Sequence, residues 1–132
     1  MQTAVNRFLC AVLSMALIVV SSLASAADIK EINHDTFASI AQSSMIVDVR
    51  TPEEFAQGHV PGAVNIPVAT VADNIAMFGA KDTSIVLYCR TGNRVKKAHA
   101  LLSNAGYNNL HHLEGDIKGW EDAGKEMEMP EQ

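Results

Sequence analysis

Short apolar segments alternate with helically spaced apolar positions along the chain from residue 29 onward. Five segments are predicted as β-strands because they are short and rich in apolar or β-branched residues, namely 29–32, 45–49, 63–66, 85–88 and 110–113. Residues 85–88 are apolar at every position. This run is typical of a parallel strand that is covered on both faces, so it is predicted as the central strand.

Helices are predicted between these strands from apolar spacing and from residues that favour helix ends. A short helix is expected after Asn33. Thr51 is predicted as the N-cap of the next helix, with Pro52 in its first turn and Glu54 completing a capping box. Gly58 is expected to end this helix.

Two further helices are predicted over 68–78 and 95–105, where apolar residues recur three and four positions apart. Gly106 is predicted as the C-cap of the second. Ile117 and Trp120 are expected to anchor a closing turn. The alternation of strands and helices predicts an α/β fold with an open, mostly parallel five-stranded sheet and helices on both faces.

The start of the chain has the pattern of a secretory signal peptide. Arg7 precedes the apolar run 8–20, and residues 24–26 (Ala-Ser-Ala) fit a signal-peptidase site. A retained membrane anchor over 8–27 stays open as an alternative, because that stretch carries no charge. We expect a periplasmic or otherwise exported protein, divided into a signal peptide at 1–26, one folded domain at 27–122 and an acidic, flexible tail at 123–132.

Charge and cysteine content narrow the partners and the chemistry. The formal net charge of −5 argues against nucleic acid or an anionic membrane surface as the main partner. The chain has two cysteines, and Cys10 would be removed with the signal peptide. Cys89 would then have no partner for an internal disulfide, so it is either an inert buried thiol or a reactive one.

The position of Cys89 favours the reactive alternative. It follows the predicted central strand directly, and ligands of open α/β sheets bind beyond the carboxyl ends of the strands. The next five residues form a short turn into a helix, whose unpaired N–H groups would stabilise a thiolate. The predicted substrate-binding loop therefore consists of Arg90, Thr91, Gly92, Asn93 and Arg94.

The surrounding residues favour an anionic substrate, and no motif for another nucleophile or for a metal site accompanies them. Arg90 and Arg94 are predicted to attract the substrate, whereas Lys96 and Lys97 are expected on a solvated helix face. No serine-hydrolase motif is found. The adjacent histidines at 111–112 would point to opposite faces of a strand, so no metal site and no cofactor are predicted.

Three segments resemble the rhodanese family, namely Asp48-Val49-Arg50-Thr51-Pro52-Glu53-Glu54-Phe55, Gly58-His59-Val60-Pro61-Gly62-Ala63-Val64-Asn65-Ile66-Pro67 and Cys89-Arg90-Thr91-Gly92-Asn93-Arg94. The resemblance covers about 29–120, so it identifies 27–122 as a rhodanese-like domain. With the export pattern, the chain is similar to the small periplasmic phage-shock members of the family.

The resemblance implies sulfur transfer through a persulfide on Cys89. The expected partners are a small anionic sulfur donor, such as thiosulfate or a persulfide, and a thiol or cyanide acceptor, with a protein acceptor as a further option. Loop amides and Arg90 or Arg94 would stabilise the charged species. Asp48 and Arg50 match family positions that we interpret as supporting scaffold, and His59 is expected to serve turn structure.

The chain departs from the family pattern at three places. Val95 stands where the helix after the loop normally begins with Ser or Thr, and Gly115-Asp116 replaces the usual Gly-Gly. Both changes are expected to alter loop shape and acceptor docking without touching the nucleophile. Thr91 replaces the basic residue of some thiosulfate-using members, which weakens the case for thiosulfate as the natural donor.

Three other functions are weighed against an enzyme that uses a small donor. A phosphatase is disfavoured, because related phosphate loops place Arg six residues after the Cys, whereas Val95 holds that place here. A non-catalytic binding module is disfavoured because such members commonly lose the Cys. A persulfide carrier or thiol-redox protein with a protein donor remains the main alternative.

Overall fold

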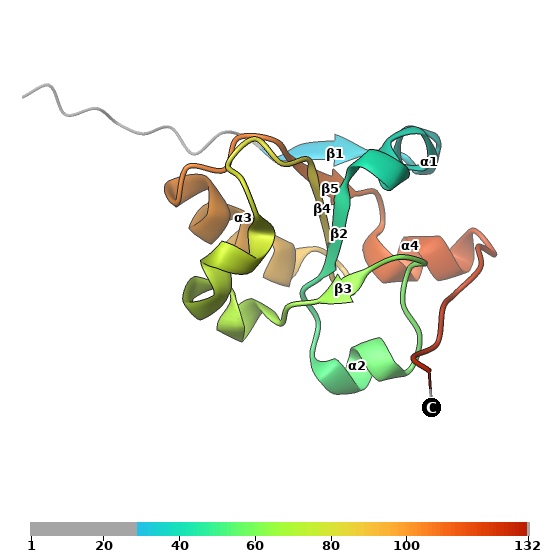
Figure 1. The fold of residues 1–132 in the computed structure, drawn as a ribbon. Helices are drawn as coiled ribbons and strands as arrows, with labels where there is room; N and C mark the ends of the chain where they lie inside the picture. The colour runs from blue at the N-terminus through green and yellow to red at the C-terminus, as the bar shows by residue number, and fades with distance from the viewer. Residues whose placement is uncertain (1–28, 132) are drawn as a thin grey trace, which may run out of the picture.

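Five strands form one parallel sheet in the computed structural model, which describes residues 29–131 (Figure 1). They are β1 (Lys30–Ile32), β2 (Met45–Asp48), β3 (Val64–Asn65), β4 (Ile85–Tyr88) and β5 (Leu110–Leu113). Their order across the sheet is β1-β5-β4-β2-β3, and every neighbouring pair is parallel. The five predicted strands and the open parallel sheet are confirmed, with β4 in the centre.

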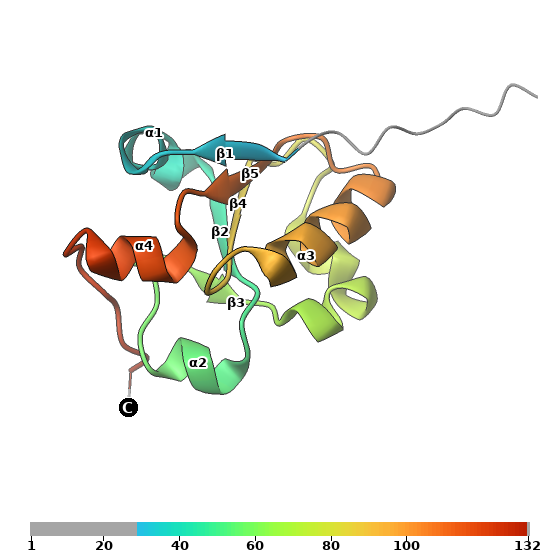
Figure 2. The same cartoon turned by 180° about the vertical axis from the view of Figure 1, so that it is seen from behind.

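The central strand is buried on both faces because its side chains alternate between two apolar layers. Ile85 and Leu87 pack with one cluster, and Val86 and Tyr88 pack with the other. The first layer is covered by α3 (Asn93–Asn104) with the 3-10 helices η2 (Val68–Thr70) and η3 (Ala72–Phe78), and the second by α1 (His34–Ile40) and α4 (Asp116–Asp122) (Figures 1 and 2). The predicted helices on both faces are thus confirmed.

Two short elements complete the chain path. The 3-10 helix η1 (Ala41–Ser43) continues α1, and α2 (Pro52–Ala56) follows β2 at the carboxyl edge of the sheet (Figure 1). Thr51 is the N-cap of α2, and its hydroxyl accepts the Glu54 N–H at 3.3 Å. The predicted N-cap is therefore confirmed. The Glu54 carboxylate, however, reaches the Thr51 hydroxyl and Arg94 instead of the Thr51 N–H, so the capping box is only half formed.

Two sequence predictions on local structure were wrong. Residues 68–78 do not form one helix, because the chain breaks at Asn74, whose side-chain amide donates to the Thr70 carbonyl at 2.8 Å and competes with the backbone. Ile117 and Trp120 do not sit in a turn but on α4, where both are buried against the sheet. A side-chain hydrogen bond thus decided the first conformation, and packing of apolar side chains on the sheet decided the second.

The segment expected to be a loose tail is instead attached to the domain. The N–H of His59 donates to the Glu128 carbonyl at 2.9 Å, and the Glu128 N–H donates back to His59 at 2.8 Å. The Trp120 indole donates to the Glu126 carbonyl at 2.8 Å. Figure 1 shows this red segment returning toward α2. The apolar Met127 and the paired backbone groups explain why the acidic composition did not predict its placement.

The predicted signal peptide, 1–26, lies outside the described residues. Within 29–131, no helix has the length and apolar character needed to cross a membrane.

Candidate active site

Cys89 lies where β4 ends and the loop into α3 begins, at the edge where the carboxyl ends of the strands meet. Its side chain is 1% exposed, and its Sγ accepts the Gly92 N–H at 3.0 Å. The main chain of Cys89 is fixed on both sides by α4, because its N–H donates to Asp116 Oδ1 at 2.9 Å and its carbonyl accepts the Ile117 N–H at 3.0 Å. The sulfur is therefore held in one position at the N-terminus of a 12-residue helix.

Gly92 is the N-cap of α3 and requires glycine for two reasons. Its φ of +101° lies in the region that side chains disfavour. A Cβ at this position would also lie 3.3 Å from Asp116 Oδ2 and 3.4 Å from His112 Cε1. The backbone N–H that contacts the sulfur thus belongs to a residue at which any side chain would be strained and crowded.

Gly92→Ala is expected to displace this N–H from the sulfur. We expect about a tenfold or larger loss in the rate at which iodoacetamide alkylates Cys89, and a destabilisation of about 1–3 kcal/mol. Gly124→Ala is the matched control, since Gly124 also has positive φ but a Cβ added there would meet nothing within 4 Å. It should lose stability without losing reactivity. Equal reactivity of the two variants would contradict the role given to the Gly92 N–H.

Arg94 reaches the site from α3, but its guanidinium is already paired. It donates to both carboxylate oxygens of Glu54, at 2.6 and 3.0 Å, and thereby ties α3 to α2. These bonds raise the pKa of Arg94, and the charge of Cys89 adds to the effect. Arg94 therefore interacts with Cys89, yet its attraction for an anion is partly cancelled by Glu54.

The Glu54–Arg94 ion pair predicts a loss of stability in acid. Hydrogen bonding to Arg94 lowers the pKa of Glu54 from 4.5 to about 2. The pair thus stabilises the folded state fully above the unfolded-state pKa, and this stabilisation is lost as the pH falls from 4.5 to about 2. We expect the difference in unfolding free energy between wild type and Glu54→Gln to be constant at neutral pH. This difference should vanish as the pH approaches about 2.

Urea unfolding at each pH measures this difference. Glu53→Gln, at the exposed neighbouring carboxylate, is the control and should show no comparable loss. A Glu54→Gln difference that persists unchanged at the acid limit would mean that the ion pair is not the cause.

The other loop residues form the rim of the site. Arg90, Thr91 and Asn93 are exposed, as are Lys96 and Lys97 on the solvated helix face that was predicted. Beside the loop lies a hollow of about 170 Å³, lined by Arg50, Glu54, Gln57, Gly58, Arg90, Ile117, Lys118 and Glu121. A hollow of similar volume lies at the opposite edge of the sheet, around Tyr107 and His111, and is remote from Cys89.

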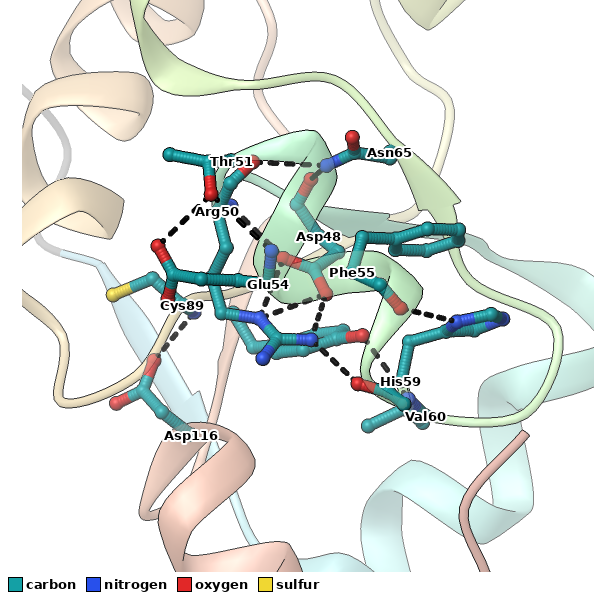
Figure 3. A network of polar contacts seen from close by, with 12 residues as sticks. Asp48, Arg50, Thr51, Glu54, Phe55, His59, Val60, Asn65, Cys89 and Asp116 are labelled. Carbon is teal, nitrogen blue, oxygen red and sulfur yellow. Dashed lines mark hydrogen bonds and ion pairs between the residues drawn. The ribbon is translucent and has the colours of Figure 1, made fainter. Parts of the chain in front are cut away.

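Asp48 and Arg50 form a buried ion pair at the end of β2 (Figure 3). Their side chains are 0% and 7% exposed, and the Arg50 guanidinium donates to Asp48 at 2.7 and 3.0 Å and to the Gly58 carbonyl at 2.8 Å. Burial lowers the pKa of Arg50, but the bonds and charge of Asp48 outweigh it, so that the pKa is raised overall. The pair links β2 to the end of α2.

The His59 side chain packs against α2. Its ring stacks on Phe55 with 3.7 Å between centroids, and its Nδ1 lies 3.2 Å from the Phe55 carbonyl oxygen. These contacts agree with the structural role that was expected of it.

Asp116 and His112 are site residues that the sequence analysis missed. Asp116 was expected to stay clear of the nucleophile, but its carboxylate accepts the Cys89 N–H, and His112 Nε2 lies 2.9 Å from the same oxygen. The available signal was the aspartate in place of the family's second glycine. Val95, the other departure, is buried in the apolar layer under α3. Within 29–131, no group of three or more His, Cys, Asp or Glu side chains could hold a metal ion.

Comparison with known proteins agrees with this architecture. Residues 25–123 match the model of the rhodanese-like domain. A sulfurtransferase from Allochromatium vinosum is 37% identical over 87 residues, which cover 66% of this chain and 80% of that protein. A tRNA uridine(34) hydroxylase from Erwinia tasmaniensis is 35% identical over 92 residues, which cover 66% of this chain but only 26% of that longer protein.

Solved structures show the same fold. A rhodanese-related protein from Thermoplasma volcanium superposes with a TM-score of 0.69 at 26% identity, covering 76% of this chain and 99% of that one. A human single-domain sulfurtransferase superposes with a TM-score of 0.61 at 25% identity, covering 70% and 95%. The family model matches most of the chain, and Cys89 lies at the carboxyl edge of the sheet. The chain therefore belongs to the rhodanese-like domain family, which includes sulfurtransferases.

Proposed function

We propose that this protein is a sulfurtransferase that carries sulfane sulfur as a persulfide on Cys89. The observation that carries the proposal is the Gly92 N–H directed at Sγ from the N-terminus of α3. Such a donor, with the positive end of the helix, favours negative charge on sulfur. The relatives named as sulfurtransferases support the same reaction class.

The reaction has two displacements. The Cys89 thiolate attacks the outer sulfur of the donor, a new S–S bond forms, and the donor's own S–S bond breaks. The leaving group, sulfite from thiosulfate or a thiolate from a persulfide, takes the electron pair. An acceptor thiolate then attacks the outer sulfur of the Cys89 persulfide, which restores the Cys89 thiolate and gives the acceptor persulfide.

The charges around the site favour a persulfide over thiosulfate as donor. Thiosulfate releases a doubly charged sulfite, which needs free cations. Arg94 is held by Glu54, and the Asp116 carboxylate bonds to Cys89 itself. Arg90 is the exposed cation of the loop. A thiol persulfide transfers sulfur with less developing charge, so we infer that it loads Cys89 faster than thiosulfate does.

Mass spectrometry tests the function. The purified protein is incubated with thiosulfate or with a small-molecule persulfide, and the peptide that contains Cys89 should gain the mass of one sulfur atom. Cyanide should then remove that sulfur. If neither donor adds sulfur to Cys89, sulfur transfer by this thiol is ruled out.

We also propose that the protein is exported, on the strength of the signal-like pattern at 1–26. The mass of the protein isolated from its own cells should then correspond to a chain that begins at Ala27. An uncleaved N-terminus would favour the membrane-anchor alternative.

A further inference from the structure

Asp116 combines a strained backbone with a side-chain oxygen that has two hydrogen-bond partners. Its φ is +56°, the one positive value for a residue other than glycine between 29 and 131. The residue is 2% exposed, and its Oδ1 both accepts the Cys89 N–H and lies 2.9 Å from His112 Nε2. A residue with a side chain is strained in this conformation, and a glycine would avoid that strain. The strain at this position indicates that the carboxylate has a role that glycine could not fill.

His112 places a titratable group one hydrogen bond away from the Cys89 main chain. It lies on β5, and its side chain is 14% exposed. An ionised carboxylate only accepts hydrogen bonds, so His112 Nε2 donates to Asp116. Its other ring nitrogen, Nδ1, is 3.7 Å from the Glu31 carboxylate on β1. The groups that face this ring are thus two carboxylates and the loop of Cys89, whose Gly92 lies against His112 Cε1.

We propose that Asp116 and His112 are a proton-responsive positioning pair that controls the reactivity of Cys89. This inference deepens the proposed function and rests on it. Asp116 holds the main chain of Cys89 and so fixes the sulfur under the Gly92 N–H. Its negative charge opposes negative charge on that sulfur, and the proton on His112 cancels this effect.

The pair gives sulfur transfer a defined dependence on pH. The imidazole of His112 can gain or lose a proton, whereas a glutamine in its place cannot. When His112 is protonated, the Asp116 charge is neutralised and the thiolate is favoured. When His112 loses its proton, an uncompensated carboxylate remains beside the loop, so both thiolate formation and the approach of an anionic donor are disfavoured.

The test measures the alkylation rate of Cys89 by iodoacetamide between mildly acidic and mildly basic pH. His112→Gln should lower the rate at acidic pH by about tenfold, because the carboxylate is no longer balanced. Adding Asp116→Asn to that variant should restore the rate, since asparagine retains an acceptor oxygen without the charge. His111→Gln is the matched control on the same strand, where the ring contacts Asn109 instead, and should follow the wild type.

Identical alkylation rates across the pH range for His112→Gln, His111→Gln and the wild type would overturn the proposal. Failure of Asp116→Asn to restore the rate in a folded double variant would overturn it as well. If the double variant does not fold, the comparison of the two histidine variants decides alone. Alkylation needs no sulfur donor, so a missing sulfur adduct would refute the proposed function without affecting this result.

Discussion

Cys89→Ser is expected to lose sulfur loading and turnover by about a thousandfold or more, because a serine hydroxyl is not ionised near neutral pH and is a poor nucleophile toward sulfur. The hydroxyl is close in size to the thiol and is expected to accept the Gly92 N–H in place of the sulfur. We therefore expect the folded state to change in stability by no more than about 1 kcal/mol.

Turnover, the persulfide adduct and thermal unfolding of the same preparations measure this prediction. Cys89 is the free cysteine within 29–131, so no neighbouring thiol replaces it in that part of the chain. Gly124→Ala serves as a control for the effects of mutation and purification alone, since a Cβ added at that glycine would meet nothing within 4 Å. Turnover retained by Cys89→Ser would mean that the nucleophile lies elsewhere.

Asp48→Ala is expected to destabilise the protein by about 3–5 kcal/mol, because it leaves the Arg50 guanidinium buried without its counter-charge. Arg50 is 6% exposed and donates both its Nε and its Nη2 to the Asp48 carboxylate. The same carboxylate accepts the Arg50 N–H at 2.8 Å, so the end of β2 also loses a backbone partner.

Two comparisons show whether burial of the charge is the cause. Asp122→Ala breaks an exposed pair with Lys118, at 3.6 Å, and should cost no more than about 1 kcal/mol. Adding Arg50→Met to Asp48→Ala removes the unpaired charge and should recover part of the loss. Urea denaturation measures all three variants. If Asp48→Ala lowers the free energy of unfolding no more than Asp122→Ala does, the buried ion pair contributes little to stability.

Several features were predictable because neighbouring residues determine them. The apolar run of β4 indicated a buried central strand, and the residues after it indicated a loop into a helix with Cys89 at its start. The Thr51 N-cap was predictable for the same reason, since a cap depends on three or four consecutive residues. The family resemblance rests on such local segments as well.

Other features were hidden because they join positions that are distant in sequence. Arg94 was expected to be free for a substrate, but Glu54 is 40 residues away and becomes its partner only when α2 and α3 meet at the sheet edge. The attachment of Glu128 to His59 was missed for the same reason.

The sequence by itself therefore determined the α/β class, the order of strands along the chain and the candidate nucleophile, because hydrophobic period and turn residues act locally. The tertiary structure alone decided the surroundings of that nucleophile. Asp116 is 27 residues from Cys89 and comes from the start of α4, yet it bonds to the Cys89 main chain. Parallel strands bring their carboxyl ends together at one edge, so contacts there depend on strand order across the sheet, which local patterns do not encode.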